Sequence, residues 1–217
     1  KAVIFSGVRQ CGKTTLMKES LPQDAVYVSL DKENFRQAAE EAPGGFLQQY
    51  RGRSCLAIDE VQKVPVLFHE IKAFADESPA LRQYLLSGSS NYKTMPTIHE
   101  SMAGRLGEVR LRPMTEGEIQ GRPSRFVERV HKAEFSETIT VADCSKRVIL
   151  EKALRGGFPD VLHLEGEQRD YWFEAYVGSL VMRDLLELGD FRKPQYLRML
   201  LEQCAASSSR MVNVSSL

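Results

Sequence analysis

Hydrophobic residues in the first half of the chain gather in five short runs, which polar stretches and turns separate. Short runs rich in β-branched and aromatic residues, bounded by residues that favour turns, predict strands. The predicted strands are Ala2–Ser6, Ala25–Leu30, Ser54–Ile58, Gln83–Ser87 and Gly107–Leu111.

Segments with helical periodicity lie between several of these runs. Leu67, Ile71 and Phe74, for example, recur at a spacing that places them on one helix face. The predicted helices are Lys13–Ser20, Glu33–Glu41 and Val66–Glu77, whereas Pro43–Gly45 is predicted to form a loop. Strands that alternate with helices predict βαβ units. We therefore expect an α/β fold with a mostly parallel five-stranded sheet flanked by helices.

The second half of the chain is richer in helical patterns, and turn-forming residues around Gly121 mark the change in composition. We place a domain boundary there, which predicts one domain over 1–121 and a smaller, mainly helical domain over 122–217. The strongest predicted helices of the second domain are Asp170–Leu188 and Pro194–Ala206.

The residues that follow the first predicted strand have the spacing of a phosphate-binding P-loop. Its glycines let the chain turn where a Cβ would obstruct it, so that successive backbone N–H groups point at the phosphates. Lys13 adds a positive charge over those phosphates, and the Thr14 hydroxyl is a suitable ligand for a bridging Mg²⁺. The predicted nucleotide-binding residues are Gly7, Val8, Arg9, Gln10, Cys11, Gly12, Lys13, Thr14 and Thr15.

Two adjacent acids, Asp59 and Glu60, close the third predicted strand. A buried strand that ends in carboxylates delivers them to the carboxyl edge of a parallel sheet, where ligands bind. Asp59 is predicted to hold Mg²⁺, and Glu60 is predicted to polarise the water that attacks the γ-phosphate. Without a P-loop upstream, the same pair would more commonly be a strand end or a helix cap.

Small polar residues follow the fourth predicted strand, where a sensor of the γ-phosphate is needed. A hydroxyl or an amide there can orient the attacking water. Ser87 and Ser89 are the predicted sensors, while Ser90, Asn91 and a plain polar turn stay open as alternatives. Arg105, before the fifth strand, is predicted to approach the triphosphate within the chain or across subunits; the alternative is a structural arginine.

Charge in the chain is balanced, with 29 Lys and Arg against 29 Asp and Glu, so no overall basic field favours nucleic acid. A DNA contact would need a local basic patch. The four cysteines and four histidines are scattered, which argues against a metal cluster or disulfide framework and favours reduced thiols in the cytoplasm. The pattern contains no membrane span or leader peptide, and a chain that begins at Lys1, just before a strand, is expected to have further residues upstream.

Short motifs in a fixed order run along nearly the whole chain. They comprise residues 7–16, 30–31, 57–65, 84–90 and 102–107 in the first half, and residues 156–160 and 183–184 in the second. Together they resemble the AAA-type ATPases of bacteria and archaea that carry a C-terminal domain of unknown function. The resemblance implies an ATP-binding core in which Lys13, Thr14, Asp59 and Glu60 have the roles argued above. It also implies that the serine-rich tail leads into a winged-helix-like segment.

These expectations converge on an Mg²⁺-dependent ATPase whose cycle moves the C-terminal helical module. ATP is preferred over GTP because no guanine-reading N/T-K-x-D segment follows the fourth strand. One alternative is a nucleotide-gated switch that binds DNA or a protein partner through the C-terminal region with negligible turnover. Another is a small-molecule phosphotransferase, which would need an acceptor pocket and lid arginines. The oligomeric state stays open.

Overall fold

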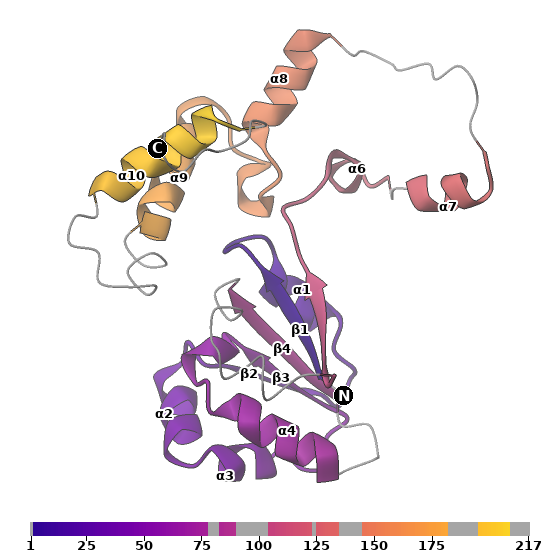
Figure 1. Ribbon diagram of the computed structural model, residues 1–217, viewed down its shortest axis with the longest axis vertical. Coiled ribbons are helices and arrows are strands. Elements are labelled where there is room, and N and C mark those ends of the chain that lie inside the picture. Colours follow the sequence, from indigo (N-terminus) through magenta and orange to yellow (C-terminus); the bar gives the residue numbers. More distant parts are fainter. Residues whose placement is uncertain are drawn as a thin grey trace. The chain divides into compact units, whose positions relative to one another are not determined.

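The computed structural model describes residues 2–77, 83–89, 104–122, 125–134, 145–181 and 195–208 (Figure 1). The chain divides into two compact units, Lys1–Asp160 and Val161–Leu217. The first unit contains the sheet and all of the predicted site residues. The predicted domain boundary near Gly121 stays a prediction. None of the described helices is long and apolar enough to cross a membrane.

Five parallel strands form one sheet, which confirms the predicted fold class. Their order is β2-β3-β4-β1-β5, so β4 lies between β1 and β3. Because the strands run in one direction, their carboxyl ends meet at the same edge of the sheet. The register pairs Ile58 with Leu86, and their successors Asp59 and Ser87 are hydrogen bonded to each other. The strands are β1 (Ala2–Gly7), β2 (Val26–Ser29), β3 (Cys55–Asp59), β4 (Gln83–Ser89) and β5 (Leu106–Arg110).

Helices cover both faces of this sheet. On one face, α1 (Lys13–Glu19) buries Met17 against Phe5 and Ala57. The other face packs against the group at the bottom of Figure 1, which consists of α2 (Glu33–Glu41), α3 (Pro43–Gln48) and α4 (Leu67–Glu77). Successive residues of a strand point to opposite faces, which is why Ile4 and Phe5 belong to different core clusters. Burial on both faces explains the continuous apolar runs of the central strands.

The loop predicted over Pro43–Gly45 is wrong, because these residues begin the short helix α3. Proline is tolerated in the first turn of a helix, where its missing N–H has no intrahelical partner. Phe46 and Leu47 follow, and both are buried in the main core cluster. Burial of two such side chains stabilises the helix by roughly 3–6 kcal/mol. This outweighs the roughly 1–2 kcal/mol by which two glycines destabilise a helix.

Helices also dominate the second half of the described chain, as predicted. Within the stretch where turn residues cluster, reciprocal hydrogen bonds between Thr115 and Glu118 cap a single helical turn. The helical segments are α6 (Glu116–Ile119), α7 (Phe126–His131), α8 (Lys146–Arg155), the 3₁₀ turn η3 (Pro159–Val161), α9 (Gly166–Ser179) and α10 (Gln195–Ala206).

The helix α9 begins earlier than the predicted start at Asp170. Its first turn contains Glu167, and a carboxylate there is stabilised by the positive end of the helix dipole. The predicted helix end at Leu188 and the predicted start of the last helix at Pro194 lie outside the described residues.

Candidate nucleotide-binding site

The loop between β1 and α1 has an unusual backbone. Gly7 and Gly12 have φ angles of 154° and 96°, and Gln10 also lies in the left-handed region at 60°. A Cβ on Gly7 would lie only 2.2 Å from the carbonyl oxygen of Leu111, the residue after β5. The backbone N–H of Leu111 donates to the carbonyl of Ser6 at 2.7 Å, which holds the two segments together. Contacts with a distant part of the chain therefore fix the start of the loop.

Replacement of Gly7 by alanine is expected to destabilise the first unit by about 2–4 kcal/mol, because the new Cβ overlaps a backbone carbonyl at a φ that alanine disfavours. Urea unfolding followed by circular dichroism measures the effect. Gly107→Ala in β5 is the matched control, because its Cβ would have no neighbour closer than 3.8 Å. If the two variants unfold at the same urea concentration, the loop is not held as described.

Lys13 is buried, and its ammonium group is bonded within the loop. It donates hydrogen bonds to the carbonyl oxygens of Gly7, at 3.1 Å, and Val8, at 2.9 Å. These bonds use two of the three ammonium donors. Val8 and Gln10 expose their side chains, as expected of a loop that offers its backbone to a ligand. The structure thus brings a buried positive charge and the loop backbone together at the start of α1.

Three hydroxyl groups converge on the carboxylate of Asp59, which is buried at the end of β3. Thr14 Oγ1 donates to Asp59 Oδ2 at 2.9 Å, and the Tyr27 hydroxyl donates to the same oxygen at 2.7 Å. Ser87 Oγ donates to Asp59 Oδ1. Burial first, and then the bond to Asp59, raise the pKa of Tyr27, so this tyrosine stays a neutral donor. The carboxylate is therefore fixed beside the first turn of α1.

Glu60 leaves the strand in a left-handed conformation, with φ at 58°. Its backbone N–H donates to Ser87 Oγ at 3.2 Å, and its carboxylate accepts a hydrogen bond from the Gln62 amide. Burial is the main cause that raises the pKa of Glu60 above its ordinary value, and the charge of Asp59 adds to the effect. A carboxylate with a raised pKa is a better proton acceptor near neutral pH.

Of the two predicted sensors, Ser87 lies in this cluster. Its hydroxyl is buried between Asp59 and Glu60, donating to the first and accepting from the second. Ser89 ends β4 beside Gly7 in the register, but its side chain lies outside the described part of the chain. Ser90 and Asn91 also lie outside the described residues.

Arg105 does not lie in the site. Its carbonyl oxygen accepts from the N–H of Ala2, at the beginning of β1, and its side chain pairs with Asp76 at 2.6 Å. The P-loop follows the other end of β1, which is about 17 Å away for five residue steps along a strand. The predicted approach within the chain is therefore wrong, because a residue that precedes a parallel strand lies at the amino edge of the sheet. A contribution across subunits stays a prediction.

The residues present fit a nucleotide-bound Mg²⁺. Thr14 and Asp59 offer a hydroxyl and a carboxylate, the oxygen ligands that Mg²⁺ prefers. Mg²⁺ commonly takes only one or two protein ligands and completes its shell with phosphate oxygens and waters. The described residues contain no group of three or more His, Cys, Asp or Glu that could hold a metal ion.

Two residues of the cluster, Tyr27 and Gln62, were not predicted. Tyr27 lies in β2, and only the adjacency of β2 and β3 brings its hydroxyl to Asp59. Gln62 follows Glu60 by two residues, and this short distance in the sequence could have indicated that it belongs to the cluster. It lies in the 3₁₀ turn η1 (Val61–Lys63).

The turn at residues 156–160 lies against the P-loop. The N–H of Met114 donates to the carbonyl of Gly157 at 2.7 Å, and a Cβ on Gly157 would lie 2.1 Å from the Met114 carbonyl oxygen. Pro159 Cγ would be 3.8 Å from a Cβ on Gly12. The segment after β5 and this turn thus form a continuous chain of contacts from Gly7 to Gly12.

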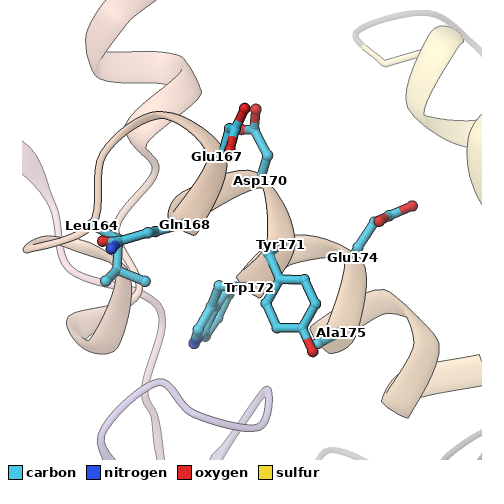
Figure 2. Close-up of a pocket in the computed structure, with 8 residues that line it drawn as sticks. All are labelled: Leu164, Glu167, Gln168, Asp170, Tyr171, Trp172, Glu174 and Ala175. Atoms are coloured by element: carbon cyan, nitrogen blue, oxygen red, sulfur yellow. The ribbon is translucent and has the colours of Figure 1, made fainter.

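A separate hollow lies in the second unit (Figure 2). Figure 2 shows its lining side chains along α9, with Leu164 just before the helix. Trp172 stacks on Tyr176 with ring centroids 5.2 Å apart, and Glu174 pairs with Arg198 at 3.3 Å. The described lining residues are Leu164, Glu167, Gln168, Asp170, Tyr171, Trp172, Glu174 and Ala175.

Comparison with protein families finds two matches along the chain. The family model of the AAA domain matches residues 1–120, and the model of a domain of unknown function, DUF8612, matches residues 147–217. These matches confirm the resemblance that the motifs indicated, to AAA-type ATPases with a C-terminal domain of unknown function.

Two curated relatives are uncharacterized proteins, Mb2031c of Mycobacterium bovis and Rv2008c of Mycobacterium tuberculosis. Each is 28% identical over 189 residues, which cover 86% of this chain and 36% of the relative. The chain therefore spans about a third of the length of these relatives.

Two solved structures are similar at a greater distance. One is a DNA replication initiation factor, 15% identical, with a TM-score of 0.41 over 86% of this chain and 57% of that chain. The other is the Aeropyrum pernix ORC1 protein in complex with DNA, 14% identical, with a TM-score of 0.44 over 88% of this chain and 63% of that chain.

Proposed function

The chain belongs to the AAA domain family, and from this premise we propose that it binds ATP with Mg²⁺ and hydrolyses it to ADP and phosphate. The observation that carries the proposal is the 2.9 Å hydrogen bond from Thr14 to Asp59. It joins the P-loop helix to the strand that bears the acid pair, so both halves of a nucleoside triphosphatase site meet at one edge of the sheet.

The P-loop residues 7–15 would hold the triphosphate. Backbone N–H groups at the start of α1 carry partial positive charge, which favours a bound anion. Lys13, already buried over the loop, would turn its ammonium toward the β- and γ-phosphates. Thr14 and Asp59 would hold Mg²⁺, which neutralises charge on the phosphate oxygens when bound.

Glu60 would act as the general base. Its carboxylate takes a proton from the water that attacks the γ-phosphorus, while the bond between that phosphorus and the β–γ bridging oxygen breaks and ADP leaves. Ser87 fixes the backbone of Glu60 and the carboxylate of Asp59 at the same time. It would therefore report a change at one acid to the other.

We also propose that the hydrolysis cycle moves the C-terminal helical, winged-helix-like region. The support is the contact chain that runs from Gly7 through Leu111 and Met114 to the turn at 156–160, where Pro159 lies beside Gly12. This turn leads directly into the second unit, which begins at Val161. We expect a shift of the P-loop on loss of phosphate to displace this turn, which is continuous in the chain with Val161.

The test of the proposed function is steady-state phosphate release from ATP by the purified chain. With Mg²⁺ the chain is expected to turn over ATP, and excess EDTA is expected to abolish turnover. Turnover that survives EDTA would overturn the role of Mg²⁺. Binding of ATP without phosphate release would overturn hydrolysis and leave nucleotide-gated binding of DNA or a protein partner.

Thr14→Ala is expected to raise the Mg²⁺ concentration needed for half-maximal phosphate release by roughly 10- to 100-fold, because one of two oxygen ligands is lost. A Mg²⁺ titration at saturating ATP measures the effect. Thr14→Ser keeps the hydroxyl and is the matched control, with an expected requirement close to that of the wild type. Equal Mg²⁺ requirements for all three proteins would remove Thr14 from the metal site.

A further inference from the structure

The turn after Glu60 is firmly anchored in the core. Val61, which begins the 3₁₀ turn η1, and Val64, which follows it, are both buried in the main cluster. Backbone hydrogen bonds from Lys63 to the carbonyl of Glu60, at 3.0 Å, and from Val64 to that of Val61, at 3.1 Å, close the turn. The backbone of Gln62 between them is therefore held in a fixed position close to the acid pair.

The Gln62 side chain lies between Glu60 and the backbone of β4. Its Nε2 donates to Glu60 Oε2, whereas its Oε1 is buried and has no hydrogen-bond partner among the described residues. That oxygen would lie 2.9 Å from a Cβ on Gly88, so only a residue without a side chain fits beside it undisturbed. Gly88 directly follows Ser87, which holds the Glu60 backbone.

A buried carbonyl oxygen without a partner disfavours the folded state by about 1–3 kcal/mol. Reversal of the amide would place this oxygen against the Glu60 carboxylate, where two acceptors repel each other, so the amide keeps its N–H groups on Glu60. A charge-assisted bond to a half-buried carboxylate offsets the unpaired oxygen. Stability alone does not account for such an arrangement, because an apolar residue of the same shape would avoid the unpaired group.

We propose that Gln62 is a positioning residue that holds the Glu60 carboxylate in the orientation from which it accepts a proton from the attacking water. The inference rests on the proposed function, since it deepens the role of Glu60 in hydrolysis. Ser87 fixes the backbone of Glu60 and Gln62 fixes its carboxylate, while Gly88 leaves room for the Gln62 amide. The general base is thus held from both β4 and η1.

Gln62→Met tests the hydrogen bond with little change in volume. It is expected to lower kcat by roughly 10- to 100-fold, the effect of a misplaced catalytic group, with the ATP dissociation constant unchanged. Gln37→Ala is the matched control, because Gln37 Nε2 donates to Glu41 Oε1 at 2.8 Å in the same manner on the exposed surface of α2. Phosphate release at varied ATP, with ATP binding by calorimetry, separates kcat from affinity.

A double variant separates positioning from a merely structural role. If Gln62 acts only through Glu60, Gln62→Met is expected to cause no further loss in a Glu60→Gln background. Gly88→Ala is expected to displace the amide and to lower kcat as Gln62→Met does.

Two results would overturn the inference while the proposed function stands: wild-type kcat in Gln62→Met, or losses that multiply in the double variant. A wild type that does not hydrolyse ATP, or that is insensitive to Glu60→Gln, would instead overturn the proposed function and the inference with it.

Discussion

Replacement of Lys13 by alanine is expected to weaken ATP binding on the order of 100-fold and to leave the sheet folded. Lys13 supplies the buried ammonium of the P-loop, and a hydrogen bond between charged groups is worth about 1.5–3 kcal/mol. The variant also removes the two bonds to the carbonyls of Gly7 and Val8. These act within the loop, so the loss falls on the site rather than on the core.

Calorimetric titration with a non-hydrolysable ATP analogue measures this effect, and circular dichroism checks the fold. Lys18→Ala is the matched control, because Lys18 belongs to the same helix but is exposed, with its ammonium over the Tyr27 ring. It is expected to bind the analogue as the wild type does. Wild-type affinity in Lys13→Ala would contradict the assignment of the P-loop.

The P-loop and the acid pair could be predicted from the sequence because their chemistry is local. A loop between one strand and one helix needs its glycines, lysine and threonine at fixed spacing, and Asp59 and Glu60 are neighbours in the chain. The strand runs were also recognisable, since burial on both faces demands continuous apolar residues. At most of the strand ends, the observed boundary differs from the predicted one by one or two residues.

The remaining parts of the site depend on which strands become neighbours. Tyr27 meets Asp59 because β2 adjoins β3, and Ser87 meets it because β4 lies between β1 and β3. Spacing along the chain does not reveal this order. Arg105 also shows the limits of spacing. It lies at the amino edge of the sheet because of the direction of the strands, and its distance in sequence to the other motifs does not reveal this.

Short helices were the least predictable elements of the fold. The residues Pro43–Gly45 have turn chemistry, yet they begin α3 because Phe46 and Leu47 enter the core. Tertiary burial outweighs local preference when a segment is short, since a single helical turn contributes little stability of its own.

Glu60→Gln is expected to lower phosphate release by roughly 10²- to 10⁴-fold, the usual contribution of a general base, with ATP affinity retained. Glutamine keeps the size of the side chain but cannot take a proton from the attacking water. The retained affinity follows from the position of Glu60, which lies beyond Asp59 and makes no hydrogen bond to the P-loop residues among its described contacts. Single-turnover phosphate release with saturating MgATP measures the rate.

Glu41→Gln is the matched control for Glu60→Gln. Glu41 also accepts a hydrogen bond from a glutamine amide, that of Gln37, but it lies exposed on α2. Replacement of the Glu41 carboxylate is therefore expected to leave the rate of phosphate release unchanged. A Glu60→Gln rate equal to that of the wild type, with ATP still bound, would favour a switch that holds nucleotide without turning it over. The reason is that the proposed hydrolysis needs the Glu60 carboxylate to take a proton from the attacking water, so phosphate release that does not depend on this carboxylate is not the proposed turnover.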